Sequence, residues 1–204
     1  MIVAQQPTGG SIAWPEHVPA IQILESPLGP IALAATPAGL LAVEIGIGDL
    51  DAWREMVDRW MTQNRSARTT RRMHSPVLVV MARGPGATDI CRKAAVQLDE
   101  YFAGERQTFD LPLDRSLFSS FQIKVLPRVQ AIPYGQTRTY GDLARQIRRP
   151  AAARAVGQAN ARNPLAIVVP CHRLVGADGS LRGYGAPGGI RVKAWLLEHE
   201  QDHL

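Results

Sequence analysis

Two neighbouring residues, Cys171 and His172, are the part of this sequence best suited to chemistry. Cysteine is scarce, with 2 among the 204 residues, and this one follows Pro170 at the end of the apolar run 167–169. A thiol beside an imidazole can lose its proton near neutral pH, and the thiolate is the nucleophilic form. The alternative is a small buried hydrophobic residue beside a surface histidine. The segments around the pair must decide between these interpretations.

The residues before the pair indicate how the thiol is positioned. Proline fixes its own φ and biases the preceding residue toward extended backbone. The apolar run 167–169 followed by Pro170 therefore predicts a short buried strand that presents Cys171 where it ends. Successive strand residues point to opposite faces, so direct contact between Cys171 and His172 would need a distorted backbone.

The composition, 46% hydrophobic and 20% charged, is that of a soluble globular protein. The longest apolar runs are too short to cross a membrane, and the first residues lack the pattern of a secretory signal. We therefore expect a cytoplasmic protein in which Cys91 and Cys171 are free thiols. The five His residues are scattered, and the sequence contains no metal-ligand spacing.

Basic charge is concentrated in the second part of the sequence. Residues 113–204 hold 13 Lys and Arg against 6 Asp and Glu, whereas residues 1–112 hold 10 against 12. One-sided basic charge favours a polyanionic partner, with nucleic acid as the first candidate. A solvated basic surface is the alternative.

Residues 21–112 are expected to form a scaffold domain that follows an extension over residues 1–20. Three β-type runs separated by turn residues predict an antiparallel meander. They lie at residues 21–24, 31–34 and 40–45. Asp49 is expected to cap a helix over 49–60, and a second helix should run from Thr88 or Asp89 to Phe102. The polar stretch 62–88 between the helices is expected to be a loop.

Residues 113–204 are expected to form a second domain that reads nucleic acid. Thr139 should cap a short helix at 140–147, and a basic turn at 148–150 leads to an Ala-rich helix at 151–160. Two short helices joined by a tight turn are typical of a helix-turn-helix. The small side chains of the second helix allow close approach to DNA, with Arg154 projecting from that face. The alternative is a plain packing helix.

Further elements surround the thiol in this domain. A helix is predicted over 119–131, a hairpin turn at 176–179, a Gly-rich loop at 180–189 and a closing helix at 189–200. The thiol thus lies between a helix-turn-helix and a wing-like hairpin. That combination is unusual for a transcription factor.

Four segments of this domain resemble the O6-alkylguanine-DNA alkyltransferase family, also called methylated-DNA–protein-cysteine methyltransferases. They are IPYGQTRTYGDLA (132–144), ARAVGQANARNP (153–164), IVVPCHRLVG (167–176) and GGIRVKAWLLEHE (188–200). The segment SPLGP (26–30) resembles the family's N-terminal domain less distinctively. The resemblance implies an α+β fold, with an N-terminal ribonuclease-H-like antiparallel sheet with helices and a C-terminal winged helix-turn-helix domain.

The resemblance also implies catalytic roles. Cys171 would accept the alkyl group, His172 would act as its base through a bound water, and Glu200 would orient the imidazole. Asn163 would brace the turn between the DNA-reading helix and the thiol. Tyr140 would contact the flipped nucleotide and its phosphate, and could protonate the leaving guanine.

It implies DNA and base contacts as well. Arg154 would enter the duplex from the minor groove and fill the gap left by the extruded base. Further DNA contacts are expected from Ala153, Arg148 and Arg149. The carbonyls of Cys171 and Leu174 would read the guanine edge, and the pocket would be lined by Tyr184 and Gly185. The loop 183–189 is longer than the Tyr-x-Gly-Gly version of some members, so the amide that meets the guanine oxygen stays open.

The implied function is repair of double-stranded DNA that contains alkylated guanine. An alkyl group at O6 of guanine, with O4 of thymine as a further target, would move irreversibly to Cys171. The thioether product resists hydrolysis, so the protein is consumed in one turnover and needs no cofactor and no metal. We expect a monomer without membrane contact, and leave cooperative assembly on DNA open.

Other interpretations fit parts of the sequence. Related alkyltransferase-like proteins recognise the lesion without repairing it, but they lack the reactive cysteine. A papain-type hydrolase would keep its Cys and His far apart in sequence. The Arg-rich stretch 62–88 is expected to be a disordered surface insertion, with an auxiliary DNA contact as the alternative.

Overall fold

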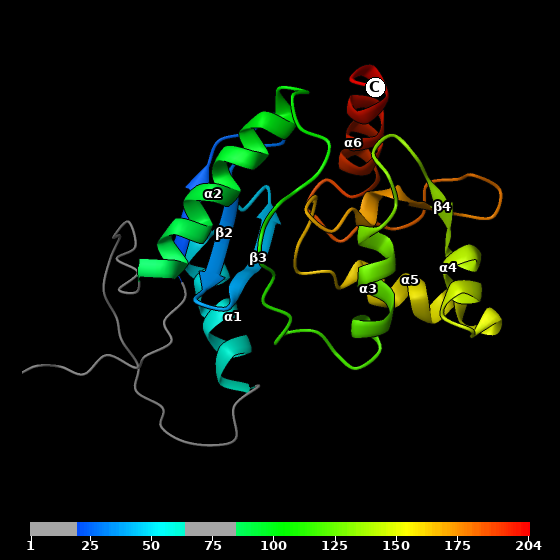
Figure 1. The fold of residues 1–204 in the computed structure, drawn as a ribbon, viewed down its shortest axis with the longest axis horizontal. Helices are drawn as coiled ribbons and strands as arrows, with labels where there is room; N and C mark the ends of the chain where they lie inside the picture. Colours follow the sequence, from blue (N-terminus) through cyan, green and yellow to red (C-terminus); the bar gives the residue numbers. More distant parts are fainter. Residues whose placement is uncertain (1–19, 64–84) are drawn as a thin grey trace, which may run out of the picture.

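The computed structural model of this chain describes residues 20–63 and 85–204. A three-stranded sheet with two helices is followed by a mostly helical C-terminal part (Figure 1). Nearly all of the expected extension 1–20 and most of the expected loop 62–88 lie outside the described residues. Among the described helices, none is both long and apolar enough to cross a membrane.

The N-terminal sheet is the antiparallel meander that the turn residues predict. Its strands are β1 Ala20–Leu24, β2 Ile31–Thr36 and β3 Gly39–Ile45, with β2 in the centre. The turn between β1 and β2 is closed by a 3.0 Å hydrogen bond from the N–H of Gly29 to the carbonyl of Ser26. β2 is buried along its whole length, because a helix covers each face of the sheet.

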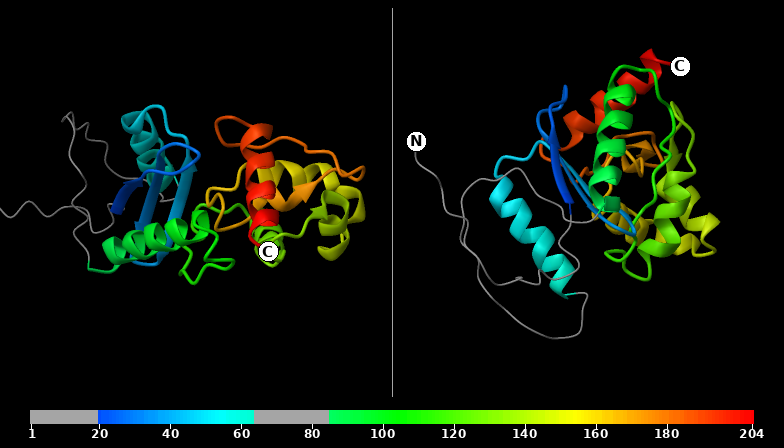
Figure 2. Two further views of the ribbon diagram at one scale, coloured as in Figure 1. Left: turned by 90° about the horizontal axis from the view of Figure 1, so that it is seen from above. Right: turned by 60° about the vertical axis from the view of Figure 1, so that its left-hand side comes forward.

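These two helices, α1 Leu50–Gln63 and α2 Pro85–Phe102, lie on opposite faces of the sheet (Figure 2, left). Asp49 caps α1 as expected, since its Oδ1 accepts a 3.0 Å hydrogen bond from the N–H of Ala52. The predicted start of α2 at Thr88 or Asp89 is wrong, because the helix begins at Pro85. Proline suits the first helical position, where the N–H would have no partner within the helix.

Two short helices of the C-terminal part form the helix-turn-helix. α4 spans Tyr140–Gln146 and α5 spans Ala153–Ala161, with a 3₁₀ turn at Pro150–Ala152 before α5. Thr139 caps α4 as expected. Its Oγ1 accepts a 3.0 Å hydrogen bond from the N–H of Asp142, whose Oδ2 accepts one of 2.9 Å from the N–H of Thr139.

α3, Gln122–Gln130, packs against α5. It is shorter than the predicted helix, although the N–H of Ile123 already bonds to the carbonyl of Ser119 at 3.0 Å. The Gln122 side chain reaches the end of α5, where its Nε2 donates to the carbonyl of Arg162 at 2.9 Å. Carbonyls at a helix end lack partners within the helix. This bond therefore satisfies the end of α5 and fixes it on α3.

The predicted strand at 167–169 is wrong. The N–H of Val169 bonds to the carbonyl of Leu165 at 2.8 Å, which closes a turn, and Ile167 has a φ of 68°. The β-type pairing of this segment is a parallel bridge between Leu165 and Val43 of β3. The run is apolar because it is buried, and burial on all sides does not distinguish a strand from a compact turn.

Cys171 consequently lies in a 3₁₀ helix, Cys171–Arg173, rather than at a strand end. The next residues form β5, Leu174–Val175, which pairs in parallel with β4, Arg138–Thr139. In a 3₁₀ helix three residues make a turn, so the side chains of Cys171 and His172 still point in different directions.

The remaining predicted elements are present with small changes. The hairpin turn is closed by a 2.8 Å bond from the N–H of Gly176 to the carbonyl of Ser180, and residues 180–189 form a loop. α6, Ile190–Asp202, extends past the predicted end of the closing helix (red in Figure 1).

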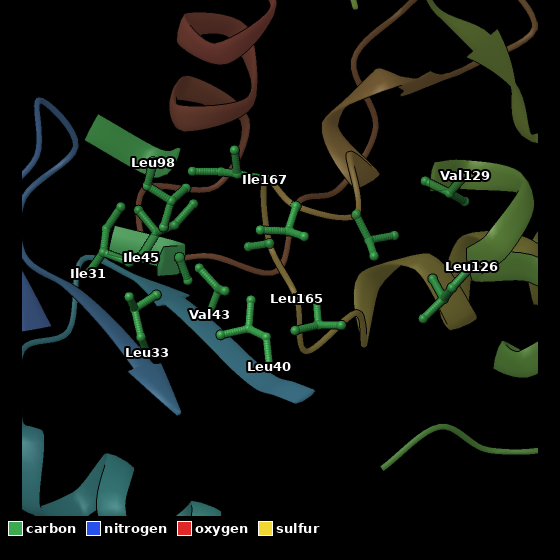
Figure 3. Close-up of a cluster of buried hydrophobic side chains, with 14 of the residues drawn as sticks. Ile31, Leu33, Leu40, Val43, Ile45, Leu98, Leu126, Val129, Leu165 and Ile167 are labelled. Atoms are coloured by element: carbon green, nitrogen blue, oxygen red, sulfur yellow. The ribbon is translucent and has the colours of Figure 1, made fainter. Parts of the chain in front are cut away.

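One buried cluster joins the N-terminal sheet to the C-terminal part (Figure 3). Val43 and Ile45 of β3 lie next to Leu165 and Ile167, which precede the thiol. The backbone is joined as well, because the N–H of Val43 bonds to the carbonyl of Pro164 at 2.8 Å. The sheet therefore positions the segment that leads to Cys171.

Candidate active site

Cys171 is 5% exposed and lies in the wall of a cavity of about 490 Å³. It and Cys91 are both free thiols, as expected. Burial raises the pKa of both, to about 12 for Cys91. At Cys171 the side chains of Asn163 and Tyr184 and the charge of Lys193 oppose this increase. Cys171 is thus the thiol around which polar groups are arranged.

His172 is fully buried, and its Nε2 lies 2.7 Å from Oε1 of Glu200. Burial alone would raise the pKa of Glu200, but the hydrogen bond from His172 and the hydrogen bonds and positive charge of Arg173 lower it to about 2. An ionised carboxylate only accepts hydrogen bonds, so Nε2 of His172 carries the proton. Burial lowers the pKa of His172 against the opposing effect of Glu200, which keeps the ring neutral near pH 7. Nδ1 has no hydrogen-bond partner in the described protein and is the atom available to act as a base.

Further donors hold the carboxylate of Glu200. Arg173 donates from Nη2 to Oε1 and from Nε to Oε2, both at 2.9 Å. The N–H of Gly135 donates to Oε2 and the hydroxyl of Tyr101 donates to Oε1, both at 3.0 Å. Neither Arg173 nor Tyr101 was predicted from the sequence to take part in the site. Arg173 directly follows the Cys-His pair, and this position could have marked it as part of the site. Tyr101 gives no such signal, because it lies 99 residues from Glu200 in the sequence.

Two asparagines hold the backbone on either side of the thiol. Asn163 Nδ2 donates to the carbonyl of Val169 at 2.8 Å, and its Oδ1 accepts from the N–H of Leu165 at 3.1 Å. These bonds span the turn that sequence analysis expected Asn163 to brace. Asn160 of α5, which was not expected at the site, donates from Nδ2 to the carbonyl of Cys171 at 3.0 Å.

Lys193 on α6 is a fully buried cation that sequence analysis also missed. Its Nζ donates to the carbonyls of Leu174 and Arg182, the latter at 3.0 Å, and to the hydroxyl of Tyr140 at 3.4 Å. Burial lowers the pKa of Lys193 to about 8, against the opposing effect of Cys171. The amine therefore remains a cation at pH 7.

Helical spacing could have revealed Lys193. It precedes Leu196 by three residues and Glu200 by seven, and residues so spaced share one helix face. Leu196 and Glu200 are both fully buried, so Lys193 shares its helix face with buried residues.

Tyr140, at the start of α4, is half-buried. Burial and the charge of Cys171 raise the pKa of its phenol, against a smaller opposing effect of Asn160. The hydroxyl is therefore protonated near neutral pH and can donate a proton. The Leu174 carbonyl expected to read the base accepts from Lys193, and a carbonyl oxygen has a second lone pair.

The pocket loop forms another wall of the cavity through Tyr184 and Gly185. The hydroxyl of Tyr184 is buried, and burial together with the neighbouring Cys171 raises its pKa well above the ordinary value. A Cβ on Gly185 would lie 2.5 Å from the carbonyl oxygen of Ala161, so the loop packs directly on the end of α5. The N-terminal part adds Glu44, a wall residue that sequence analysis missed.

The residues expected to contact DNA lie on the outer side of the helix-turn-helix. Arg154 is exposed and Ala153 half-buried on α5, whereas Val156 of the same helix is buried. Arg148 and Arg149 are exposed in the turn between the helices. The cations thus project outward, while Asn160 on the inner side of α5 contacts the thiol turn.

Comparison with known proteins agrees with this arrangement. Residues 21–115 match the family model for the 6-O-methylguanine DNA methyltransferase ribonuclease-like domain, and residues 120–202 match that for its DNA binding domain. The chain is 40% identical over 178 residues to the methylated-DNA–protein-cysteine methyltransferase of Methanosarcina acetivorans, covering 87% of this chain and 96% of that protein. The chain belongs to the 6-O-methylguanine DNA methyltransferase family.

Solved structures of 6-O-methylguanine DNA methyltransferases have the same fold. The Mycobacterium tuberculosis O6-methylguanine methyltransferase is 38% identical, with a TM-score of 0.69 over 92% of this chain and 95% of that one. The M. tuberculosis protein in complex with DNA is 40% identical, with a TM-score of 0.64 over 90% and 93%. The expected α+β fold, with a ribonuclease-like N-terminal part and a DNA-binding C-terminal part, is confirmed.

Proposed function

We propose that this protein repairs double-stranded DNA by moving an alkyl group from O6 of guanine to Cys171 in a single irreversible turnover. The observation that carries the proposal is the arrangement at the thiol. A buried cysteine precedes a fully buried histidine in the same 3₁₀ helix, and this histidine has its Nε2 2.7 Å from the Glu200 carboxylate and its Nδ1 without a hydrogen-bond partner among the described residues. Transfer to a cysteine is also the activity for which the M. acetivorans relative is named.

The first step is loss of the Cys171 proton. Nδ1 of His172 takes it through a bridging water, and the resulting imidazolium is stabilised by the Glu200 carboxylate. Burial opposes a thiolate, so the positive charge of Lys193 and the side chains of Asn163 and Tyr184 favour the ionised form.

Alkyl transfer then follows as a displacement. The Cys171 sulfur forms a bond to the alkyl carbon, and the bond from that carbon to guanine O6 breaks with its electron pair on the base. Tyr140 donates a proton to the leaving guanine and recovers one from the imidazolium through solvent, so thiol and alkylguanine become thioether and guanine. Lys193, 3.4 Å from the Tyr140 hydroxyl, stabilises the transient phenolate.

Because the thiol is 5% exposed, a base in a stacked duplex cannot reach it and must be extruded. Arg154, exposed on α5, would fill the gap left in the duplex. Ala153 would let α5 approach the groove, and Arg148 and Arg149 would contact phosphates. The M. tuberculosis relative solved in complex with DNA supports DNA as the partner.

The same proposal divides the chain into a scaffold domain, 21–112, and a DNA-binding domain, 113–204. The carbonyl of Leu174 would read the guanine, with Tyr184 and Gly185 as pocket walls. The carbonyl of Cys171, expected to share this role, already accepts from Asn160 Nδ2 and from the N–H of Leu174, so it would have to exchange one of these donors for the base. A monomeric state, a cytoplasmic location and activity on O4-alkylated thymine stay predictions.

The test is intact mass after mixing with duplex DNA that carries one O6-methylguanine. A gain of one methyl group, mapped to the peptide with Cys171 and absent from that with Cys91, is the expected result. Cys171→Ala should bind the DNA and gain no mass. Tight lesion binding by the parent protein without a mass change would assign it to the recognition-only class instead.

The role of Arg154 has its own test. Arg154→Ala should slow the reaction with duplex lesions far more than with free O6-benzylguanine, which needs no base extrusion. An equal slowing of both reactions would contradict the gap-filling role.

A further inference from the structure

Tyr101 connects the N-terminal helix α2 to the site described above. Its side chain is fully buried, and its hydroxyl donates a 3.0 Å hydrogen bond to Oε1 of Glu200. The ring is fixed among other aromatic rings, with centroids 5.7 Å from Phe109, 6.0 Å from Tyr134 and 5.3 Å from His199. The hydroxyl is therefore held on the carboxylate by a rigid side chain.

The oxygen that receives this bond is the one that holds the histidine. Oε1 of Glu200 lies 2.7 Å from Nε2 of His172 and also accepts from Arg173 at 2.9 Å. The other donors to Glu200 among the described residues, Gly135 included, come from the C-terminal part. Tyr101 is the contribution of α2 to this carboxylate.

We propose that Tyr101 is a positioning residue for alkyl transfer, which sets the orientation and basicity of the Glu200 carboxylate and, through it, the proton affinity of His172. The N-terminal part then takes a direct share in the reaction in addition to supporting the thiol turn. This inference rests on the proposed function, because it assumes that His172 is the base.

Oε1 of Glu200 is shared by donors from His172, Arg173 and Tyr101. Each hydrogen bond donated to a carboxylate stabilises its ionised form and lowers its basicity. Burial and the negative charge of Glu200 raise the pKa of the Tyr101 phenol, so it remains a donor throughout the useful pH range. Without its hydroxyl, Oε1 would attract the Nε2 proton of His172 more strongly, and the pKa of His172 would rise.

Other charges around His172 and Glu200 are unchanged by loss of the hydroxyl. The charged groups that act on His172 are Arg173 of the 3₁₀ helix and Glu200 and Lys193 of α6. Glu200 itself faces His172 and Arg173 from the 3₁₀ helix, with the phenols of Tyr101 on α2 and Tyr134 before α4 nearby. A shift in the pH profile on loss of the Tyr101 hydroxyl therefore reports on its bond to Glu200.

The experiment compares Tyr101→Phe with the parent protein, using the full chain and duplex DNA that carries O6-methylguanine. Single-turnover alkyl transfer is measured from pH 5 to pH 9, with the protein in excess. We expect the rate to fall by up to about tenfold, the effect of losing one net hydrogen bond from the network that positions the base. The acidic limb of the profile should move to higher pH, because protonated His172 cannot accept the thiol proton.

Tyr134→Phe is the matched control. The Tyr134 hydroxyl is buried without a hydrogen-bond partner in the described protein, and its ring packs against that of Tyr101. The same chemical change in the same aromatic cluster should leave the rate and the acidic limb at parent values.

The outcomes separate this inference from the proposed function. No transfer by the parent protein would contradict the proposed function itself. Transfer by the parent with an unshifted profile in Tyr101→Phe would assign Tyr101 a structural role only, whatever the change in melting temperature. Should Tyr101→Phe fail to fold, 3-fluorotyrosine in place of Tyr101 keeps the shape and strengthens the donor. The acidic limb should then move to lower pH, and an unmoved limb would overturn the inference.

Discussion

Glu200→Gln removes one negative charge from a fully buried network and keeps the shape of the side chain. The Arg173 side chain is 6% exposed, so its charge would remain inside the protein without a counterion. Removing one partner of a buried ion pair typically costs about 3–5 kcal/mol. The variant should therefore lose a large part of the stability of an ordinary domain.

The lowered pKa of Glu200 gives a second measure of the same loss. Its pKa is about 2 in the folded protein, against an ordinary value of 4.5. A carboxyl group with a lowered pKa contributes stability above its unfolded pKa, and that stability disappears as the pH falls through its folded pKa. At roughly 1.4 kcal/mol per pKa unit, the contribution at pH 7 is about 3 kcal/mol.

Urea unfolding of the parent and Glu200→Gln proteins at several pH values would measure this loss. The gap in unfolding free energy should be about 3–5 kcal/mol at pH 7 and should close as the pH falls from about 4.5 to about 2. Glu198→Gln, an exposed change on the same helix, is the control and should match the parent. A gap below about 1 kcal/mol at pH 7 would refute the view that Glu200 neutralises Arg173.

Three further changes probe other parts of the structure. Asn163→Ala leaves the N–H of Leu165 without a partner and removes one of the two donors to the carbonyl of Val169, where the N–H of Cys171 remains at 2.7 Å. The unfolding free energy should therefore fall by about 1–3 kcal/mol in urea titrations, and unchanged stability would contradict the bracing role. In Gly39→Ala, with φ of 152°, the new Cβ would lie 2.6 Å from the backbone carbonyl oxygen of Pro112, and calorimetry should show a lower melting temperature. Below about pH 6.5 the histidine takes up a proton in the unfolded chain, whereas buried His172 stays neutral in the folded protein. The unfolding free energy of the parent should therefore fall as the pH drops below about 6.5. In the same titrations, the unfolding free energy of His172→Gln should fall less between about pH 6.5 and about pH 5.

Local rules were enough to predict the elements whose ends are set by neighbouring residues. The meander follows from its turn residues, and the caps at Asp49 and Thr139 form within three residues of each cap. The thiol and its histidine were found because they are adjacent in sequence. Glu200 was inferred from a family resemblance, because spacing alone does not connect it to residue 172.

The features that sequence analysis missed depend on long-range packing. The turn at 167–169 forms because its backbone is held by Asn163 and its neighbours pack on β3, and an apolar run carries no sign of either contact. The contact between Tyr101 and Glu200 joins residues 99 positions apart. A tyrosine at position 101 looks like any core aromatic until α2 and α6 are brought together.

The ion pair between Arg173 and Glu200 has a consequence for synthesis of the chain. The ribosome makes the thiol, the histidine and the arginine before it makes the acid that completes them. Until α6 has emerged, the guanidinium of Arg173 lacks Glu200, the carboxylate that it pairs with in the folded protein. A product truncated before residue 200 would carry the nucleophile without a stable site, and such a fragment should be open to proteases. The reactive cysteine therefore has a stable site only in chains that have been made as far as Glu200 on α6.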